Sequence, residues 1–338
     1  MTEDNALAGA DRKLPGLPRA VNDEDMRALF SSSLNRQAKG GDDFISQVRH
    51  KVLKYTPGKR CVIEYWLYPR ENRNNPRRII GKLYRKDRGR IIFDNLRQLW
   101  QDSLGRDLPG ERFGMPEPLI FLPEIGIVLQ HAVPGRQLSS FSASDDLPAA
   151  IRGIAENAAA LHRLPVTVGE KKLLDDHLKK YYHPYAQAFR EACPELAPLV
   201  ESILAGLASD DTLRQAPICP AHGDLGLTQI FIEGDRAFFI DFDGFCLSHA
   251  ALDVSNFLIA LQVHFGSQSE ALTAIFLETY LKRQSATMLP GLKVYQALIY
   301  LRRAMICFRR KTGAEWRRVA RQLLEKAEAM LEEARLSQ

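Results

Sequence analysis

Four polar residues, His222, Asp224, Gln229 and Asp241, flank two otherwise apolar runs within the segment 222–244. Polar side chains that flank apolar strands call for a chemical or structural explanation. Phosphoryl transfer would supply one, because an aspartate must accept the proton of a hydroxyl group while an amide oxygen and a second carboxylate hold Mg²⁺. Oxygen atoms are also the ligands that Mg²⁺ prefers. These residue types therefore suggest the chemistry of a phosphoryl-transfer site.

The two apolar runs, QIFIEG and RAFFIDF, are joined at Gly234-Asp235, which is a favoured two-residue turn, so we expect a β-hairpin. The competing interpretation is an ordinary turn at His222-Gly223-Asp224, with both aspartates capping neighbouring elements. Either motif alone is compatible with that interpretation. Their occurrence together, joined by the expected hairpin, favours the chemical one.

The runs HGDLGLTQI and IDFDG resemble the H-G-D-x-x-x-x-N and I-D-x-x-D motifs of aminoglycoside phosphotransferases, choline kinases and their relatives, which share the protein-kinase fold. The resemblance implies that Asp224 is the catalytic base, that Asp241 binds the metal bridging the ATP phosphates, and that His222 holds the catalytic loop. Gln229 replaces a metal-binding asparagine with a side chain one methylene longer. Asp243 either assists the metal or makes a structural hydrogen bond. The implied cofactors are ATP, or another nucleoside triphosphate, and Mg²⁺.

Two further segments resemble the same family. ALDVSNFLIAL is similar to a D-x-x-D-L-A segment, which implies that Asp253 supports the catalytic loop. An aspartate favoured by a helix N-terminus is the other interpretation, and the two are compatible. AALHRLP resembles a helix end of the family, which gives His162 a structural role.

Lys82 lies in the strand-like run RRIIGKLYR, which a helix follows directly, as does the kinase lysine that holds the α- and β-phosphates. The alternative is a lysine on a solvated strand face. Kinases pair this lysine with a helix glutamate, but residues 90–103 contain none. We expect either a shorter partner such as Asp94 or a different contact.

The nucleotide-covering turn is assigned to YTPGKR, in which Gly58 is the single glycine. The two basic residues after it either add positive charge beside the phosphates or are ordinary exposed turn residues. The run VLQHAVPGRQL resembles the family's hinge, so backbone groups near Gln130, His131 and Ala132 are expected to bind adenine.

The elements around these motifs predict an α+β protein with the bilobal protein-kinase-like fold. Residues 1–22 lack a hydrophobic period and are expected to form a flexible arm. A β-rich, nucleotide-binding lobe is expected over 23–133, opening with a helix at 23–38 and continuing as three strands, a helix and a strand. Residues 134–338 are expected to form a larger, mainly helical lobe that carries the catalytic loop and the hairpin.

Composition narrows the class of protein further. The chain has 338 residues and a net charge of +5, which suits anionic ligands without requiring nucleic acid or a membrane. The five cysteines form no C-x-x-C pair, so we expect packed, reduced thiols. No apolar run approaches the length of a membrane span, and no signal peptide is visible, so a cytoplasmic protein is expected.

Other chemistries lack their signatures. The sequence contains no G-x-x-x-x-G-K-[ST], G-x-G-x-x-G, G-x-S-x-G or H-E-x-x-H motif. Several arginines between 302 and 321 form a basic cluster, interpreted as a solvated face with ion pairs, as a site for an acidic substrate, or as a nucleic-acid surface, in decreasing order of preference.

The sequence therefore predicts an ATP- and Mg²⁺-dependent phosphotransferase that acts on a hydroxyl group of a small molecule. A pseudokinase without turnover is the main rival, because of the residue at 229 and the missing helix glutamate. A protein kinase is disfavoured, since no A-P-E-like segment follows IDFDG. The acceptor and the oligomeric state stay open, although acidic residues at 175, 176, 191 and 195 would suit a cationic acceptor.

Overall fold

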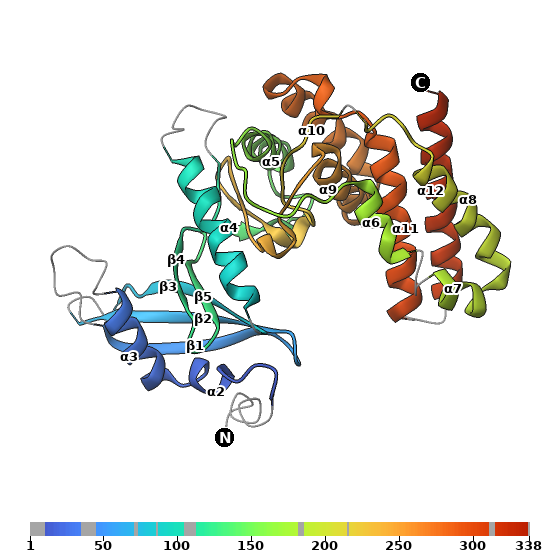
Figure 1. Ribbon diagram of the computed structural model, residues 1–338. Coiled ribbons are helices and arrows are strands. Elements are labelled where there is room, and N and C mark those ends of the chain that lie inside the picture. The colour runs from blue at the N-terminus through green and yellow to red at the C-terminus, as the bar shows by residue number, and fades with distance from the viewer. Residues whose placement is uncertain are drawn as a thin grey trace. The chain divides into compact units, whose positions relative to one another are not determined.

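The computed structural model describes residues 11–34, 45–70, 74–85, 87–104, 113–181, 186–214, 216–310 and 315–336. The chain divides into two compact units (Figure 1). The first comprises Met1–Gln101 and Met115–Pro134, and the second comprises Asp102–Gly114 and Gly135–Gln338. Strands dominate the first unit and helices the second, so the protein belongs to the α+β class, as the sequence predicts.

The first unit is built on a five-stranded antiparallel sheet of order β1-β2-β3-β5-β4. Its elements are β1 (Ile45–Thr56), β2 (Arg60–Pro69), β3 (Arg77–Tyr84), α4 (Arg88–Ser103), β4 (Pro118–Leu122) and β5 (Ile127–His131). The three strands, the helix and the last strand were predicted. The short strand β4 was not predicted.

The turn between β1 and β2 follows from its residue types. The Thr56 carbonyl accepts a hydrogen bond from the Lys59 N–H at 3.0 Å, with Pro57 and Gly58 between them. Gly58 has a φ of 66°, which glycine adopts without strain. Proline followed by such a glycine is the signature of a type II turn, and it joins the two strands in register.

Two N-terminal helices, α2 (Leu17–Ala20) and α3 (Asp23–Leu34), lie along one face of this sheet (Figure 1). Leu14 and Phe30 are fully buried in the same hydrophobic cluster as the sheet residue Tyr65. Asn22 caps α3, since its side-chain oxygen accepts the N–H groups of two residues in the first turn. The expectation of a flexible arm therefore does not hold for residues 11–22, which pack onto the sheet. Residues 1–10 lie outside the described part of the chain.

Helices form the bulk of the second unit. They are α5 (Leu147–His162), α6 (Leu174–Lys180), α7 (Ala186–Ala192), α8 (Ala197–Ala208), α9 (Ala250–Phe265), α10 (Ser269–Arg283), α11 (Leu292–Arg310) and α12 (Trp316–Leu336). A hydrophobic cluster joins α6, α7, α8, α9, α11 and α12. None of the helices that the structure describes combines the length and apolar composition needed to cross a lipid bilayer.

Two small sheets lie within the second unit. One contains β6 (Arg136–Gln137), β8 (Ile230–Glu233) and β9 (Arg236–Phe239), and the other pairs β7 (Cys219–Ala221) with β10 (Cys246–Ser248). The predicted hairpin is the β8–β9 pair. It packs closely against α5, because a Cβ atom at Gly153 would lie 2.1 Å from the Asp235 carbonyl oxygen. This contact fixes the hairpin on the helix.

All five cysteines are free thiols, as expected, and all but the partly exposed Cys307 are buried. Burial raises the pKa of Cys246 to about 12. The buried thiols therefore behave as small apolar side chains.

Candidate active site

The loop that follows β7 carries His222, Gly223 and Asp224. Gly223 has a φ of 80°, and a Cβ atom there would lie only 2.2 Å from the Gly244 carbonyl oxygen. A side chain at this position would therefore separate two segments that now touch. The glycine lets the HGD loop and the IDFDG loop pack directly on each other.

Asp253, in the first turn of α9, fixes the backbone of the HGD loop, residues 222–224. Its two carboxylate oxygens accept the backbone N–H groups of His222 and Gly223, at 2.6 and 2.8 Å. The same carboxylate lies 3.3 Å from Nε2 of His162. Burial would raise the pKa of Asp253, but the hydrogen bond and charge of His162, with the N–H of His222, lower it. The buried carboxylate is therefore ionised.

His222 connects the loop to the strand that precedes Asp241. Its Nε2 lies 2.8 Å from the carbonyl oxygen of Ile240, so Nε2 must donate the hydrogen bond, because a carbonyl can only accept. Its ring lies against the ring of Phe242, with centroids 4.8 Å apart. The buried Nδ1 atom has no partner within the described chain. His222 thus connects the HGD loop to the end of the β8–β9 hairpin.

Asp224 differs from its neighbours, because its side chain is 55% exposed. Its Oδ1 atom accepts a hydrogen bond from Nη2 of Arg302, on α11, at 2.9 Å. Among the described residues, Oδ2 has no hydrogen-bond partner. The backbone is thus held firmly while one carboxylate oxygen faces the surroundings.

Gln229 and Asp241 lie at the same end of the β8–β9 hairpin. The N–H of Ile240 donates to the Gln229 carbonyl at 2.8 Å, which extends the ladder by one step beyond the strands. The amide oxygen of Gln229 accepts from the Thr228 hydroxyl at 3.0 Å. Asp243 lies in the short 3₁₀ turn Phe242–Gly244 that follows. The β8–β9 hairpin therefore places the amide of Gln229 and the carboxylates of Asp241 and Asp243 at the same end of the hairpin.

Asp241 adopts an unusual backbone conformation. With φ 67° and ψ 52° it is the one non-glycine residue with a positive φ in the part of the chain that the structure describes. This conformation costs on the order of 1–3 kcal/mol, and strain of this kind persists where the surroundings impose it, often at functional sites. The packing of His222 and Phe242 supplies such surroundings.

These oxygen atoms fit the preference of Mg²⁺. Within the described residues, no three His, Cys, Asp or Glu side chains are grouped so that they could hold a metal ion. A bound Mg²⁺ would therefore depend on Asp241, on the amide oxygen of Gln229, and on oxygens of phosphate and water.

The remaining predicted residues lie in the first unit. Gly81 of β3 packs under Tyr65 and Ile127, and since side chains alternate along a strand, Lys82 faces the opposite side of the sheet. Lys82 is buried, with 7% of its surface exposed. Asp94, offered by the sequence as its partner, is exposed on α4.

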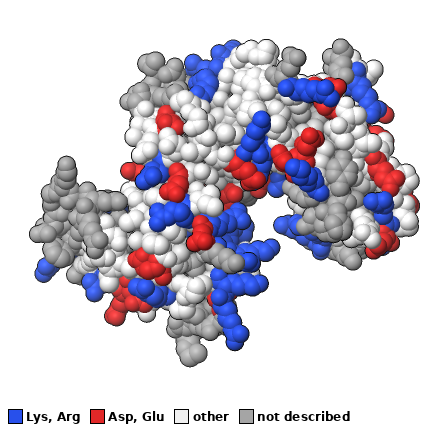
Figure 2. All heavy atoms as spheres, viewed as in Figure 1, with Lys and Arg blue, Asp and Glu red and all other residues white. Residues whose placement is uncertain are grey.

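The turn at Gly58 has a contact that the sequence did not suggest. The Gly58 N–H donates to Oδ2 of Asp11 at 2.6 Å, and the Tyr55 hydroxyl donates to the same oxygen at 2.8 Å. The hydrogen bond from Gly58 is the main cause of the lowered pKa of Asp11. Lysine and arginine side chains gather at this end of the sheet (Figure 2). The turn is thus positively charged and attached to the N-terminal segment.

The segment predicted to bind adenine lies at the end of β5, and its role stays a prediction. The His131 N–H donates to the Glu117 carbonyl at 2.9 Å, and the Ala132 N–H donates to the Arg78 carbonyl at 3.1 Å. Gln130 is buried within β5. Both N–H groups are therefore used by the sheet itself, and adenine would need other backbone groups of this segment.

Sequence reasoning missed Arg302 as a site residue and Asp11 altogether. Arg302 belonged to the C-terminal basic cluster, for which a solvated face was preferred, and nothing in the local pattern distinguished it from its neighbours. Its contact with Asp224 joins positions 78 residues apart. Only the tertiary structure brings them together.

Comparison with known proteins places these features in a family. The sequence model of the phosphotransferase enzyme family, APH, matches residues 104–295, more than half of the chain. A search of curated proteins found no match.

Three solved structures resemble the chain over most of its length. A choline kinase from Cryptosporidium parvum Iowa II is 12% identical with a TM-score of 0.63, covering 92% of this chain and 95% of its own. An ethanolamine kinase from Plasmodium vivax is 14% identical with a TM-score of 0.59, covering 95% and 96%. A spectinomycin phosphotransferase, solved with ADP and spectinomycin, is 10% identical with a TM-score of 0.57, covering 92% and 98%. At these identities the likeness establishes the fold.

Proposed function

The chain belongs to the phosphotransferase enzyme family, and from this premise we propose that it transfers the γ-phosphoryl group of ATP to a hydroxyl group of a small molecule. The observation that carries the proposal is the exposed carboxylate of Asp224, held on a rigid loop beside the hairpin end that carries Gln229 and Asp241. Such an arrangement suits phosphoryl transfer, in which positioning and charge stabilisation contribute most of the catalysis.

In the proposed mechanism, Oδ2 of Asp224 accepts the proton of the acceptor hydroxyl as its oxygen attacks the γ-phosphorus. Asp253 and His222 keep the loop fixed, so that Asp224 needs little reorganisation. Asp241 and Gln229 would hold Mg²⁺, which when bound neutralises charge on the β- and γ-phosphates.

In the first unit, Lys82 and Gly58 are proposed to contact the nucleotide. Lys82 is buried on the sheet face opposite the N-terminal helices, where an ammonium group would be a strong partner for phosphate. The turn at Gly58 supports this assignment, because its backbone is fixed and its surroundings are basic. The spectinomycin phosphotransferase and an aminoglycoside phosphotransferase of similar fold, APH(2'')-Ib, were both solved with ADP, which supports a purine nucleotide as the phosphoryl donor.

The test combines nucleotide binding with turnover. Mg-ATP is expected to raise the melting temperature of the wild type, because a ligand that binds only the native state stabilises it by mass action, by about 2.7 kcal/mol at 100 times Kd. Asp241→Ala should lose that shift. Asp235→Asn changes an exposed carboxylate of the hairpin turn and serves as the matched control.

Turnover separates the enzyme from its main rival. Asp224→Asn should bind Mg-ATP as the wild type does, yet reduce phosphoryl transfer about 100-fold or more. A pseudokinase would bind nucleotide and show no transfer in the wild type either. If millimolar Mg-ATP raises the melting temperature of neither the wild type nor Asp224→Asn, the proposed nucleotide site is refuted.

A further inference from the structure

The ion pair between Arg302 and Asp224 places a cation at the proposed reaction centre. Nη2 of Arg302 lies 2.9 Å from Oδ1 of Asp224. A hydroxyl group that gives its proton to Asp224 must come within about 2.6–3.2 Å of that carboxylate. Any acceptor bound for transfer therefore has part of its surface within a few ångströms of this guanidinium group.

Arg302 has hydrogen-bonding capacity left for a ligand. Only Nη2 has a hydrogen-bond partner among the described residues, although a guanidinium group carries five N–H donors. The side chain is 29% exposed, so its position is restricted by packing while its edge stays accessible. A planar donor group with free N–H bonds matches the paired oxygens of a carboxylate or phosphate.

Neighbouring charges on α11 have the same sign. Arg309 lies about two helical turns after Arg302 and so on the same face of the helix. Arg303 is partly buried, and no ion pair for it is found in the described part of the chain. Burial lowers the pKa of Arg303, and the charge of Arg302 acts in the same direction. The positive charges of Arg302 and Arg303 therefore reinforce each other on this part of α11.

The acidic residues that would have suited a cationic acceptor are exposed and partly neutralised. Asp176 caps α6 and pairs with Lys179 at 2.6 Å. Asp175, Glu191 and Glu195 lie on the exposed surface of the second unit. Within the described residues, none of the four is hydrogen-bonded or ion-paired to Asp224 or Arg302.

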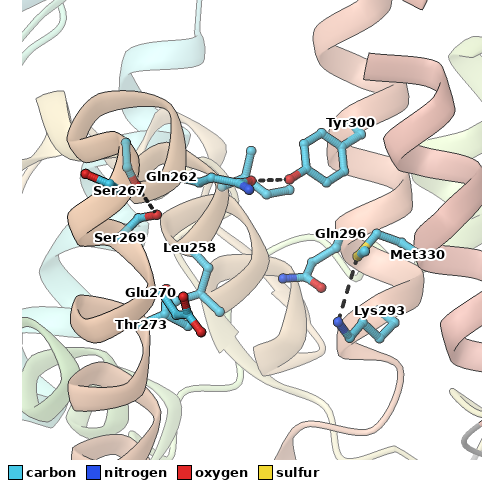
Figure 3. A pocket seen from close by; sticks show the side chains of 12 residues that line it. Leu258, Gln262, Ser267, Ser269, Glu270, Thr273, Lys293, Gln296, Tyr300 and Met330 are labelled. Atoms are coloured by element: carbon cyan, nitrogen blue, oxygen red, sulfur yellow. Dashed lines mark hydrogen bonds between the residues drawn. The ribbon is translucent and has the colours of Figure 1, made fainter. Parts of the chain in front are cut away.

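One cavity of the second unit is excluded as the acceptor site of Asp224. A pocket of about 420 Å³ lies between α9, α10, α11 and α12, with Gln296 and Tyr300 of α11 on its wall (Figure 3). Successive helical residues are about 100° apart, so Arg302 lies about 160° around the helix from Tyr300. The pocket and the Asp224 carboxylate are therefore on opposite sides of α11.

We propose that the acceptor is an anion, a hydroxyl compound carrying a carboxylate or phosphate group, and that Arg302 binds this group beside Asp224. The inference rests on the proposed phosphotransferase function. In the reaction, the acceptor oxygen forms a bond to the γ-phosphorus and its proton passes to Oδ2 of Asp224. The bond between the γ-phosphorus and the β,γ-bridging oxygen breaks, and ADP leaves with that electron pair.

The experiment compares hydroxyl compounds that share a skeleton and differ in charge. One set is glucosamine, glucose, glucuronate and glucose 6-phosphate, and a smaller set is choline, glycerol and glycerate. ADP formation and phosphorylated product are measured with Mg-ATP. Binding is measured by calorimetry in the presence of a non-hydrolysable ATP analogue. The wild type is expected to prefer the anionic members at least tenfold, in kcat/KM or in Kd.

Variants of two arginines on α11 test whether Arg302 is the residue that causes the preference for anionic acceptors. Arg302→Gln should abolish the preference for anions by raising their KM or Kd at least tenfold, with the KM for ATP little changed. Arg302→Lys should retain part of it, because the charge remains while the fork geometry is lost. Arg310→Gln, an exposed arginine on the same helix, should behave as the wild type does.

Two results would overturn the inference while leaving the phosphotransferase assignment intact. One is a wild type that binds the nucleotide analogue but prefers cationic or neutral acceptors, or binds no anion of either set at 10 mM. The other is a folded Arg302→Gln protein that keeps the preference for anions. Failure to bind nucleotide at all would instead refute the proposed function, and this inference with it.

Discussion

Replacing Asp253 with asparagine tests the central structural claim, that one buried carboxylate fixes the HGD loop. The native carboxylate accepts two backbone N–H groups, from His222 and Gly223, and lies beside His162. An amide of nearly the same shape can accept only one of these N–H groups. Its NH₂ group then faces the second donor, and His162 loses the charge of its partner.

The expected loss is about 3 kcal/mol. Hydrogen bonds to charged groups contribute about 1.5–3 kcal/mol each, and one of the two is lost outright. Removing the charge also relieves its desolvation, which opposes the loss. Breaking one side of a buried ionic contact nevertheless costs a net 3–5 kcal/mol in proteins, because the remaining groups stay buried without partners.

Native-state hydrogen exchange with mass spectrometry is the suitable assay, because a chain with two compact units need not unfold in a single step. A peptide covering 219–226 should lose about 100-fold in protection, which corresponds to about 3 kcal/mol. Asp235→Asn, an exposed carboxylate on the hairpin turn, should change the exchange of the same peptide by less than threefold. Protection of 219–226 in Asp253→Asn within threefold of the wild type would refute the reasoning.

Two further predictions concern Asp11 in the N-terminal segment and the buried residue His249. Asp11→Ala removes the acceptor of the Gly58 N–H, so amide hydrogens of the β1–β2 turn should exchange faster. The Kd for Mg-ATP, measured by calorimetry, should rise roughly threefold to tenfold. Unchanged hydrogen exchange in this turn would contradict the prediction. Burial lowers the pKa of His249 in the native state. Below about pH 6.5 the unfolded chain therefore binds a proton that the native state does not. The free energy of unfolding should fall as the pH drops, by up to about 1.4 kcal/mol per pH unit. Melting curves between pH 7 and 5 should show a smaller loss for His249→Gln than for the wild type, and equal slopes would exclude His249 as the cause.

The elements that the sequence predicts well are those specified by local chemistry. Gly234 and Asp235 supply a hairpin turn, and it is flanked by two short runs rich in apolar residues that become β8 and β9. Pro57 and Gly58 supply the type II turn between β1 and β2. In each case the turn residues and the flanking pattern favour the same structure, so no distant contact is needed to recognise it.

Residues 11–22 show why other elements were missed. Pro15, Pro18 and several charged residues give no hydrophobic period, so the sequence predicts a loose segment. Leu14 and Leu17 are nevertheless buried, because the sheet offers an apolar face that they cover. That face is built from residues far along the chain, and a local pattern cannot report it.

The same distinction applies to the candidate site. His222, Asp224 and Asp241 are near one another in sequence, so a motif could identify them. Arg302 and Asp11 reach the site residues across 78 and 47 positions, and each belongs to a residue type that is usually solvated. Tertiary contact alone distinguishes them from other charged surface residues.

The rigidity of the HGD loop has a consequence for substrate choice. Asp253 holds the loop from α9, Gly223 lies against Gly244, and His222 binds the Ile240 carbonyl, so the backbone before Asp224 is fixed from three directions. Variation there would disturb Asp224, the proposed base. The residues free to set acceptor specificity are therefore those that approach the exposed carboxylate from other elements. At an effective dielectric constant of about 20, a unit charge 5 Å from a guanidinium group interacts by roughly 3 kcal/mol, enough to discriminate about 100-fold between an anionic acceptor and a neutral one.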